Sequence, residues 1–543
     1  MLAAPQLLDH CAIKLSGSDA SKEILGAIEE VVVEDDMNLL TIITIRLTDP
    51  GLQLIDDASL AIGSEIEVKI GGDSPERVGI GEITALELDH RPGTARVIVQ
   101  AFDRGHRLHR GRHVRTFQQM SDADVVQKVA SEAGLQSDAD ATPGQHEYLI
   151  QDNLSDFAFL ARRALLTGMT LSVDDETVRF KKPSGAPSSP ITLDWESGLL
   201  RFSARVTAAD QVAEVEVRGW DPDQKQAISS TVSDSQAAPS IGLDAGQVRS
   251  SAFGSATILV TDRPVKDSSD AQALAQAALD HATGAIVLAD CVAHGDPRIK
   301  AGAEVEIKGV GERLSGTYVV TSSTHTLAPS HGYETTFVVR GRGRGSILEL
   351  SSHDDGQDGR RLGPVLGVVT NVKDPNNLGR VKVKFPWLSD DEESAWARLI
   401  SPMAGPQRGF EFVPEVDGEV VIIFELGDPN RPLVVGALWN GKDASPLGGD
   451  AIAGDGKVQK RQIKTRIGHT ILLDDSDSSK SIVITDSAGN EVKMDAANNK
   501  IEVTSKGDLT VKATGTLKLE GQGVEVKASG GDVTVSGTTI KLN

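Results

Sequence analysis

The chain has 543 residues, of which 39% are hydrophobic and only 4% aromatic, and its net charge is −23 at pH 7. This length favours several domains, each with a core of its own. The negative charge argues against a surface that binds nucleic acid or anionic lipid, because such surfaces are basic. The scarcity of aromatic side chains argues against a carbohydrate-binding enzyme, whose groove stacks sugars on aromatic rings.

The two cysteines, Cys11 and Cys291, lie far apart in the sequence. This sparse usage indicates folding in a reducing cytoplasm and is unlike that of disulfide-rich secreted proteins. The N-terminal residues lack a basic region and reach Asp9 before any long apolar run, so we expect no signal peptide. We also expect no span of about 18 apolar residues. The sequence therefore predicts cytoplasmic assembly, with release from the cell only as part of a larger particle.

The N-terminal part of the chain has a strand pattern. Apolar and polar residues alternate, β-branched residues dominate, and Asp-Pro-Gly and Gly-Gly-Asp breaks separate the runs. We expect a β-barrel or a strongly bent sheet. The predicted strands cover residues 29–35, 39–49, 64–71, 78–89 and 94–103.

Helices follow the first strands. One is predicted to begin at Ser121, where Asp124 stands three residues on, close to a capping box. A second begins at Ser155 and ends at Gly168, with apolar residues at helical spacing on one face. An alanine-rich stretch over residues 270–282 predicts a short packing helix. Further strands are expected over residues 212–222, 285–294, 303–327 and 333–343.

These patterns divide the chain into five parts, and the fold class is mainly β with inserted helices. Residues 1–350 form a β-rich body with helical insertions, and residues 351–362 form an exposed linker. Five strand-like runs over residues 363–440 fit a small barrel of the OB type. A neck rich in glycine, aspartate and alanine covers residues 441–480, and a repetitive ribbon covers residues 481–543.

The apolar residues of the ribbon come in pairs two positions apart, so both members of a pair point to one face of a strand. From Ile501 onward the pairs recur about every eight residues, separated by connectors that suit tight turns. The expected core residues are Ile482, Ile484, Val492, Met494, Ile501, Val503, Leu509, Val511, Leu517, Leu519, Val524, Val526, Val533, Val535, Ile540 and Leu542.

One copy of the ribbon cannot cover this apolar face, because no helix or second apolar pattern lies nearby. Each side chain stabilises by roughly 1.5–3 kcal/mol when fully buried. Two copies would leave open edges, whereas three copies close a triangular prism with the pairs facing a shared axis. We therefore predict an intertwined trimeric β-helix, a rigid needle. The alternative is an ordinary two-sheet sandwich.

Several segments resemble a known family. "VTNVKDPNNLGRVKVKFPWL" and "GFEFVPEVDGEVVIIFELGDPNRPLVVGALWN", with Asp374-Pro375 and Gly427-Asp428-Pro429, are similar to the OB-fold core of VgrG proteins. These are the spikes of type VI secretion systems and related phage-tail-like contractile injection systems. "AFDRGHRLHRG" and "NLSDFAFLARRALLTGMTLSV" resemble the phage late-control D, or hub, half of that family. The first 60 residues resemble the phage D-protein or extracellular injection-system version more than type VI spikes.

The resemblance implies a homotrimer with a β-barrel hub on the inner tube, a collar of three OB barrels and a β-helix needle that pierces the target membrane. It implies inner tube and baseplate proteins as partners, a PAAR-type tip protein and effector cargo. The tip protein would bind the blunt end of the needle, formed by Ile540, Lys541, Leu542 and Asn543. The resemblance implies a structural protein with no catalytic residue, no metal and no cofactor.

Other candidate sites are weak. His106, His109 and His113 have a spacing that suits a metal, but the arginines around them disfavour a cation. The acidic runs over residues 388–394 and 474–480 lack the glycine-centred order of a calcium-binding EF-hand, so we interpret them as solvated loops. We find no P-loop and no Gly-x-Ser-x-Gly elbow.

Two alternatives to a mechanical spike remain open at this point. One is a trimeric tailspike enzyme that degrades surface polysaccharide. Such an enzyme needs a wide groove with aromatic side chains and facing carboxylates, which the narrow ribbon does not favour. The other is a delivery adaptor whose C-terminal tip binds cargo or a cap, and this function overlaps with that of a spike.

Overall fold

The protein is described from a computed structural model that covers residues 11–37, 39–71, 75–142, 144–182, 190–209, 211–236, 239–250, 253–330, 332–340 and 363–541. The chain divides into two compact units, Met1–Leu438 and Trp439–Asn543, and each is described by itself. The predicted linker over residues 351–362 lies outside the described residues. Within them, no helix is both long and apolar enough to cross a membrane.

The largest element of the first unit is an eleven-stranded sheet. Its strands are β1 (Cys11–Leu15), β2 (Ser18–Asp19), β3 (Ile28–Asp36), β4 (Ile42–Thr48), β5 (Glu65–Ile70), β6 (Glu76–Arg91), β7 (Thr94–Phe102), β14 (Leu199–Val206), β19 (Val287–His294), β22 (Ser322–Ala328) and β23 (Gly332–Val339), with the short helices α2 (Lys22–Ala27) and η1 (Ala58–Leu60) between them. The strand order is β14-β19-β23-β22-β3-β4-β7-β6-β5-β1-β2. Val33 faces Ile43 in register between β3 and β4, and both are fully buried. The strands predicted over residues 29–103 are thus confirmed.

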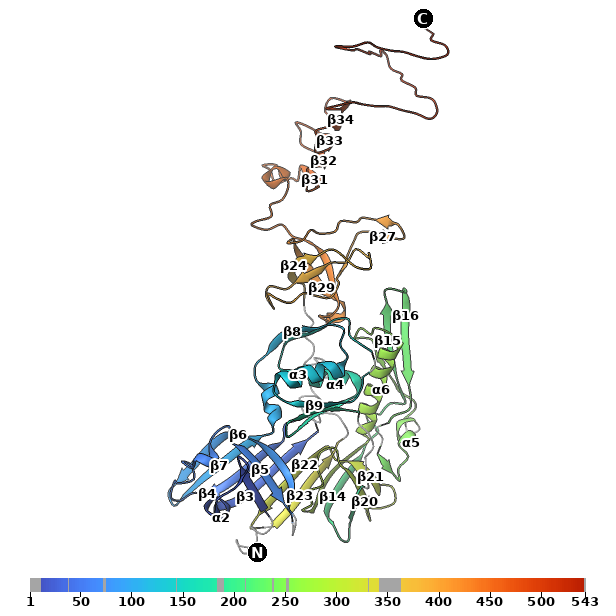
Figure 1. Ribbon diagram of the computed structural model, residues 1–543. Coiled ribbons are helices and arrows are strands. Elements are labelled where there is room, and N and C mark those ends of the chain that lie inside the picture. The colour runs from blue at the N-terminus through green and yellow to red at the C-terminus, as the bar shows by residue number, and fades with distance from the viewer. Residues whose placement is uncertain are drawn as a thin grey trace. The chain divides into compact units, whose positions relative to one another are not determined.

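The middle of the first unit contains the predicted helices. Its elements are η2 (Arg104–His109), β8 (His113–Phe117), α3 (Asp122–Glu132), β9 (Gln136–Ala139), β10 (Leu149–Leu154), α4 (Asp156–Thr167), β11 (Thr170–Asp174) and β12 (Thr177–Lys181). Ser121 and Asp124 form the expected capping box, and the Ser155 hydroxyl accepts the backbone N–H of Ala158. α4 ends at Gly168, whose φ of 68° is left-handed. α3 and α4 lie side by side (Figure 1), and their apolar faces share a core with β8, β11 and β12.

A second β-rich region follows. Its elements are β13 (Ile191–Asp194), β15 (Glu214–Asp221), β16 (Gln226–Val232), β17 (Ser240–Ile241), α5 (Ala245–Ser250), β18 (Thr257–Val260), α6 (Ser268–Gly284), β20 (Glu304–Lys308) and β21 (Gly316–Val319). α6 contains the predicted helix and begins after Asp267, whose carboxylate accepts the backbone N–H of Asp270. Ala275 and Leu279 of α6 share a core with Val217 of β15, so the helix covers one face of the sheet β16-β15-β18.

Residues 363–438 form a small β-domain, here called the collar domain. Its elements are β24 (Val365–Asn371), β25 (Lys382–Lys384), β26 (Arg398–Leu399), β27 (Ala404–Gly405), β28 (Arg408–Gly409), β29 (Glu419–Phe424), η3 (Glu425–Gly427) and β30 (Pro432–Ala437). The sheet has the order β25-β24-β29-β30-β26, and Val369, Val383 and Ile422 are fully buried in its core. The carboxylate of Asp374 accepts the Arg380 guanidinium at 2.8 Å and three backbone N–H groups. The hydrogen bonds from Arg380 hold the pKa of Asp374 well below its usual range.

The second unit contains η4 (Gly448–Ala451) and one antiparallel meander. Its strands, in both chain and sheet order, are β31 (Lys460–Lys464), β32 (Thr470–Asp474), β33 (Ser481–Thr485), β34 (Glu491–Asp495) and β35 (Lys500–Thr504). β31 and β32 lie in the segment predicted as a neck. Ile463 stands between the polar residues Gln462 and Lys464, and it pairs in register with Ile471.

Candidate self-association face of the C-terminal unit

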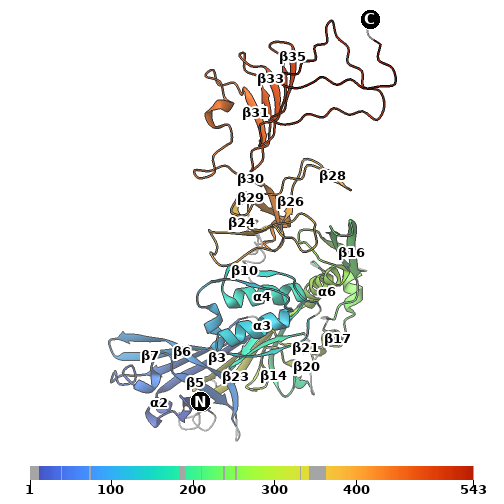
Figure 2. The same ribbon diagram turned by 45° about the horizontal axis from the view of Figure 1, so that its top comes forward.

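The strands β31–β35 form one antiparallel sheet (Figure 2). Its registers place large apolar residues in two rows that cross the strands. Residues in register on neighbouring strands point to the same face, so each row lies on one side of the sheet. Each of β32, β33, β34 and β35 contributes one residue to each row, and the two residues are two positions apart. Residues two apart in a strand point to the same side, so both rows lie on one side of the sheet. One row is Ile463, Ile471, Ile484, Val492 and Val503, and the other is Leu473, Ile482, Met494 and Ile501.

Burial in this sheet is inverted. Ile484 is 46% exposed and Ile501 is 70% exposed, whereas the most buried side chains, Asp474, Ser481 and Asp495, are polar and at most 9% exposed. A soluble chain normally buries its large apolar residues, and a contiguous exposed apolar face marks an interaction surface. The geometry of β31–β35 therefore identifies this face, here called the apolar face, as a candidate self-association surface.

The turns of the meander explain its path. Each turn between successive strands contains a residue with left-handed φ: Gly468 at 100°, Lys480 at 41°, Gly489 at 88° and Asn499 at 49°. Such residues allow a tight reversal of the chain. The carboxylate of Asp486 also holds the β33–β34 turn. It accepts Asn490 through the side chain and the backbone, and the hydrogen bonds from Asn490 lower its pKa.

The chain behaves differently after Thr504. Residues 505–541 form no strand, and every residue from Lys506 to Lys541 is exposed. Among the described residues after Asn499, neither a glycine nor any other residue has left-handed φ, so the chain makes no further hairpin of that kind. The apolar pairs nevertheless continue, and Leu519 is 70% exposed.

The structure brings together only some of the predicted core residues. Those from Ile482 to Val503 lie on the apolar face, whereas those from Leu509 to Ile540 are exposed along the extended segment. Leu542 and Asn543, predicted as core and tip residues, lie outside the described residues, while Ile540 and Lys541 are exposed. The sequence reasoning missed Ile463, Ile471 and Leu473 of the same face. The available signal was the spacing of two between Ile471 and Leu473, which is the same as in the predicted pairs.

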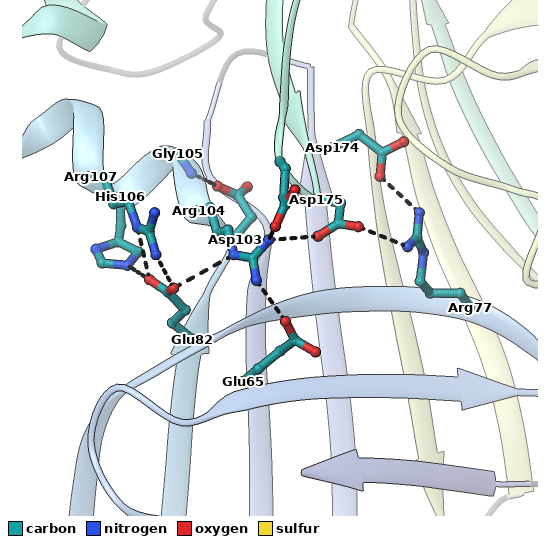
Figure 3. A network of polar contacts seen from close by, with 11 residues as sticks. Glu65, Arg77, Glu82, Asp103, Arg104, Gly105, His106, Arg107, Asp174 and Asp175 are labelled. Carbon is teal, nitrogen blue, oxygen red and sulfur yellow. Dashed lines mark hydrogen bonds and ion pairs between the residues drawn. The ribbon is translucent and has the colours of Figure 1, made fainter. Parts of the chain in front are cut away.

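A network of polar contacts in the first unit surrounds Arg104, whose side chain is 15% exposed (Figure 3). Its guanidinium contacts Glu65 at 2.6 Å, Asp175 at 3.3 Å, Glu82 at 3.6 Å and also Glu176. These carboxylates come from β5, β6 and the β11–β12 turn. The cluster therefore joins the large sheet to the helical middle region.

Asp103 stands next to this cluster and is nearly fully buried. Its carboxylate accepts the backbone N–H of Thr41 at 2.5 Å and that of Gly105 at 2.7 Å. Burial raises the pKa of Asp103 to about 7, although both hydrogen bonds act in the opposite direction. This carboxyl anchors η2 to the start of β4.

The three histidines considered as metal ligands serve other contacts. His106 Nε2 lies 2.8 Å from Glu82, the His109 ring stacks on Phe157 at 4.2 Å, and His113 Nε2 lies 3.8 Å from Asp156. In the described part of the chain, no group of three or more His, Cys, Asp or Glu side chains is arranged to hold a metal ion.

The acidic runs hold local structure. In residues 388–394, Glu392 bonds to the Thr116 hydroxyl and Glu393 lies 3.4 Å from Lys382. In residues 474–480, Asp474 accepts the backbone N–H of Ser476 at 2.9 Å. These contacts connect the run over residues 388–394 to neighbouring strands and brace the β32–β33 turn.

Comparison with known families accounts for most of the chain. Residues 6–329 match the family described as the Alg8 N-terminal domain, and residues 365–439 match the type VI secretion system/phage-baseplate injector OB domain. The first match alone covers more than half of the chain. The chain belongs to the Alg8 N-terminal domain family and is a VgrG-type spike protein.

Curated relatives of this VgrG-type spike are secretion-system spikes. Over 93 residues the chain is 34% identical to the type VI secretion system spike protein VgrG3 of Vibrio cholerae, covering 16% of this chain and 9% of that protein. Over 133 residues it is 32% identical to VgrG1b of Pseudomonas aeruginosa, covering 21% and 18%. It is also 31% identical over 93 residues to the actin cross-linking toxin VgrG1 of Vibrio cholerae, covering 16% of this chain and 8% of that protein. The chain thus spans less than a fifth of each of these relatives.

Solved structures show the same fold. A chain of a Francisella PdpA–VgrG complex is 9% identical, with a TM-score of 0.55 over 91% of this chain and 80% of that chain. The Escherichia coli c3393 protein, a type VI secretion component similar to T4 tail proteins gp27 and gp5, is 13% identical, with a TM-score of 0.51 over 78% and 99%. The VgrG-type spike therefore shares a mainly β fold with phage-tail-like proteins.

Proposed function

We propose that this VgrG-type spike acts as a homotrimer whose C-terminal units wind together into the needle of a contractile, phage-tail-like injection system. The observation that carries the proposal is the apolar face of β31–β35, which is exposed in one chain and is continued by the apolar pairs beyond Thr504. Two further copies cover that face, and each buried side chain then stabilises the trimer by roughly 1.5–3 kcal/mol.

The needle would consist of two successive segments that pair differently. From Lys460 to Thr504 each chain pairs with itself and supplies one side of a prism. Over the described residues 505–541 the backbone has no hairpin turns with left-handed φ, so its apolar pairs would need strands of the other two copies to complete a sheet. Strands paired between copies resist bending, because a bend breaks many hydrogen bonds at once.

The remaining parts fit the same proposal. Residues 1–350 would be the hub on the inner tube and baseplate, residues 363–440 the collar of three OB barrels, residues 441–480 the neck and residues 481–543 the needle. Sheath contraction would push the needle through a target membrane. Assembly would take place in the cytoplasm and yield an extracellular or phage-like particle.

The needle end would bind a separate PAAR-type tip protein, and through it effector cargo. At this end Ile540 is 51% exposed and is available to a partner. Ending the chain before Val533 should abolish co-purification with the tip protein and leave trimers. Retained co-purification contradicts the tip assignment.

Light scattering on the purified protein tests the central claim. We expect three times the chain mass of 57.4 kDa. A stable monomer at micromolar concentration contradicts the proposal. We further expect no reducing sugar from capsule or lipopolysaccharide, whereas its release would support the tailspike-enzyme alternative.

A further inference from the structure

The collar domain carries a projecting hairpin, residues 400–413, here called the arm. β27 and β28 pair beside the turn at its tip, and nearer its base the Ser401 hydroxyl donates to the Phe410 carbonyl at 2.7 Å. The arm is therefore held in shape by its own bonds. Its large apolar side chains nevertheless face outward, and Phe412 is 67% exposed. The exposed apolar residues of the arm are Ile400, Met403, Phe410, Phe412 and Val413.

The collar domain also has an apolar outer surface. In β29, Val420, Ile422 and Phe424 point into the core, so Val421 and Ile423 point out. Leu366 of β24 faces Val421 in register and is 49% exposed. Strands that are apolar on both faces are typical of a sheet that is covered on both sides. The outer face consists of Leu366, Val421, Ile423, Val435 and Trp387, whose indole N–H donates to the Leu366 carbonyl.

The cleft beside the arm is larger than a typical pocket for a small molecule. The arm forms one wall of a cleft of about 2480 Å³ within the first unit. Pockets for small molecules have volumes of roughly 300–1,000 Å³. The occupant that fits the arm is therefore another protein surface.

The connection between the collar domain and the second unit indicates that the partner of the arm is another copy of this chain. Only residues 439–459 separate the collar domain from β31, the first strand with the apolar face. A trimer of the second unit, as proposed above, therefore keeps three collar domains at high effective concentration. Each collar domain then offers one arm and one outer face to its neighbours.

We propose that the arm of one copy packs on the outer face of the collar domain of the next copy. Arm and outer face are different surfaces, so the contact is heterologous, and three such contacts close a ring. This inference rests on the proposed trimer. It adds a second interface, in which exposed phenylalanine side chains of one copy cover exposed and half-buried aliphatic residues of another.

Chemical cross-linking tests the contact in the full chain. Cys11 and Cys291 are buried, so a bismaleimide should react mainly with cysteines introduced at exposed positions. The test variant combines Phe412→Cys with Leu366→Cys, and the two single variants are its matched controls. A second double variant, Phe410→Cys with Val435→Cys, is included in case the thiols of the first double variant are separated by a distance that the cross-linker does not span. We expect covalent two- and three-chain species from the double variants only.

The outcomes separate the two proposals, because light scattering is recorded on the same samples. Trimers whose double variants both stay single-chain on a denaturing gel overturn the arm contact and leave the trimer intact. Two-chain species from Phe412→Cys alone show that arms meet one another, which also overturns it. Monomers in solution overturn the proposed function together with this inference.

Discussion

Neighbouring residues in a strand of the C-terminal sheet lie on opposite faces, because successive side chains alternate between the two sides. Ile484 lies on the apolar face, and its neighbour Val483 lies on the opposite face, where it pairs with Leu472 and Lys493. Both are aliphatic and stand in the centre of β33. They form a matched pair for testing whether the exposed face, and not hydrophobicity in general, holds the trimer together.

Ile484→Asp should abolish the trimer, because three carboxylates would meet in an apolar interface, and burying an unpaired charge costs several kcal/mol. Val483→Asp should leave the trimer intact. Light scattering checks both variants. Equal loss of trimer in both would contradict the assignment of the face.

Asp103 predicts a pH dependence of stability. Its folded-state pKa of about 7 lies above the ordinary value of about 3.9, because burial disfavours the carboxylate. The stability that this group contributes is complete below about pH 4 and is lost as the pH rises through about 7. The melting temperature should therefore fall from about pH 5 to about pH 8.

Asp103→Asn is the matched variant, because the amide does not titrate in this range. We expect a lower melting temperature at acidic pH, since one backbone N–H loses its acceptor, and a flatter profile from about pH 5 to about pH 8. An unchanged slope in the variant would assign the pH dependence to other groups.

Elements of the second unit depend on turns more than on packing. Each strand of the meander is five residues long, and its apolar side is uncovered in one chain. The hairpins therefore rely on backbone hydrogen bonds and on residues that tolerate left-handed φ. A turn is the most sensitive point at this scale.

Gly489→Ala should destabilise the β33–β34 hairpin by about 1–2 kcal/mol, because its φ of 88° is strained for any residue with a Cβ. Gly454→Ala is the control, since no heavy atom lies within 4 Å of its added Cβ and its φ is not left-handed. Chemical denaturation of the trimer compares them. Equal stability of the two variants would contradict the prediction that the left-handed φ of Gly489 stabilises the β33–β34 hairpin.

At the scale of the whole molecule, two segments of the needle should contribute differently. A chain that ends at Thr504 keeps β31–β35 and should remain trimeric, but with lower resistance to denaturant, because the later apolar pairs are gone. A chain that ends at Gln459 lacks the apolar face and should lose most of its trimers. Sedimentation velocity distinguishes these species. Stable trimers from the shorter chain would assign the main interface to the first unit.

Much of the fold was accessible from local patterns. The helix starts at Ser121 and Ser155 follow from side chains that accept nearby backbone N–H groups. The strands over residues 29–103 follow from alternation. The strands β31 and β32 were missed, because they follow a glycine- and aspartate-rich segment and β31 contains only one apolar residue, Ile463.

The sequence by itself determined which side of each strand is apolar and where the apolar pairs repeat, because both depend on spacing within a few residues. Only the tertiary structure decided that β22 lies beside β3 and that Arg104 meets carboxylates from three elements, since those contacts join distant parts of the chain. It also decided that hairpins end at Thr504. Backbone hydrogen bonds need partners, and within the described residues the chain forms no strand beyond that point.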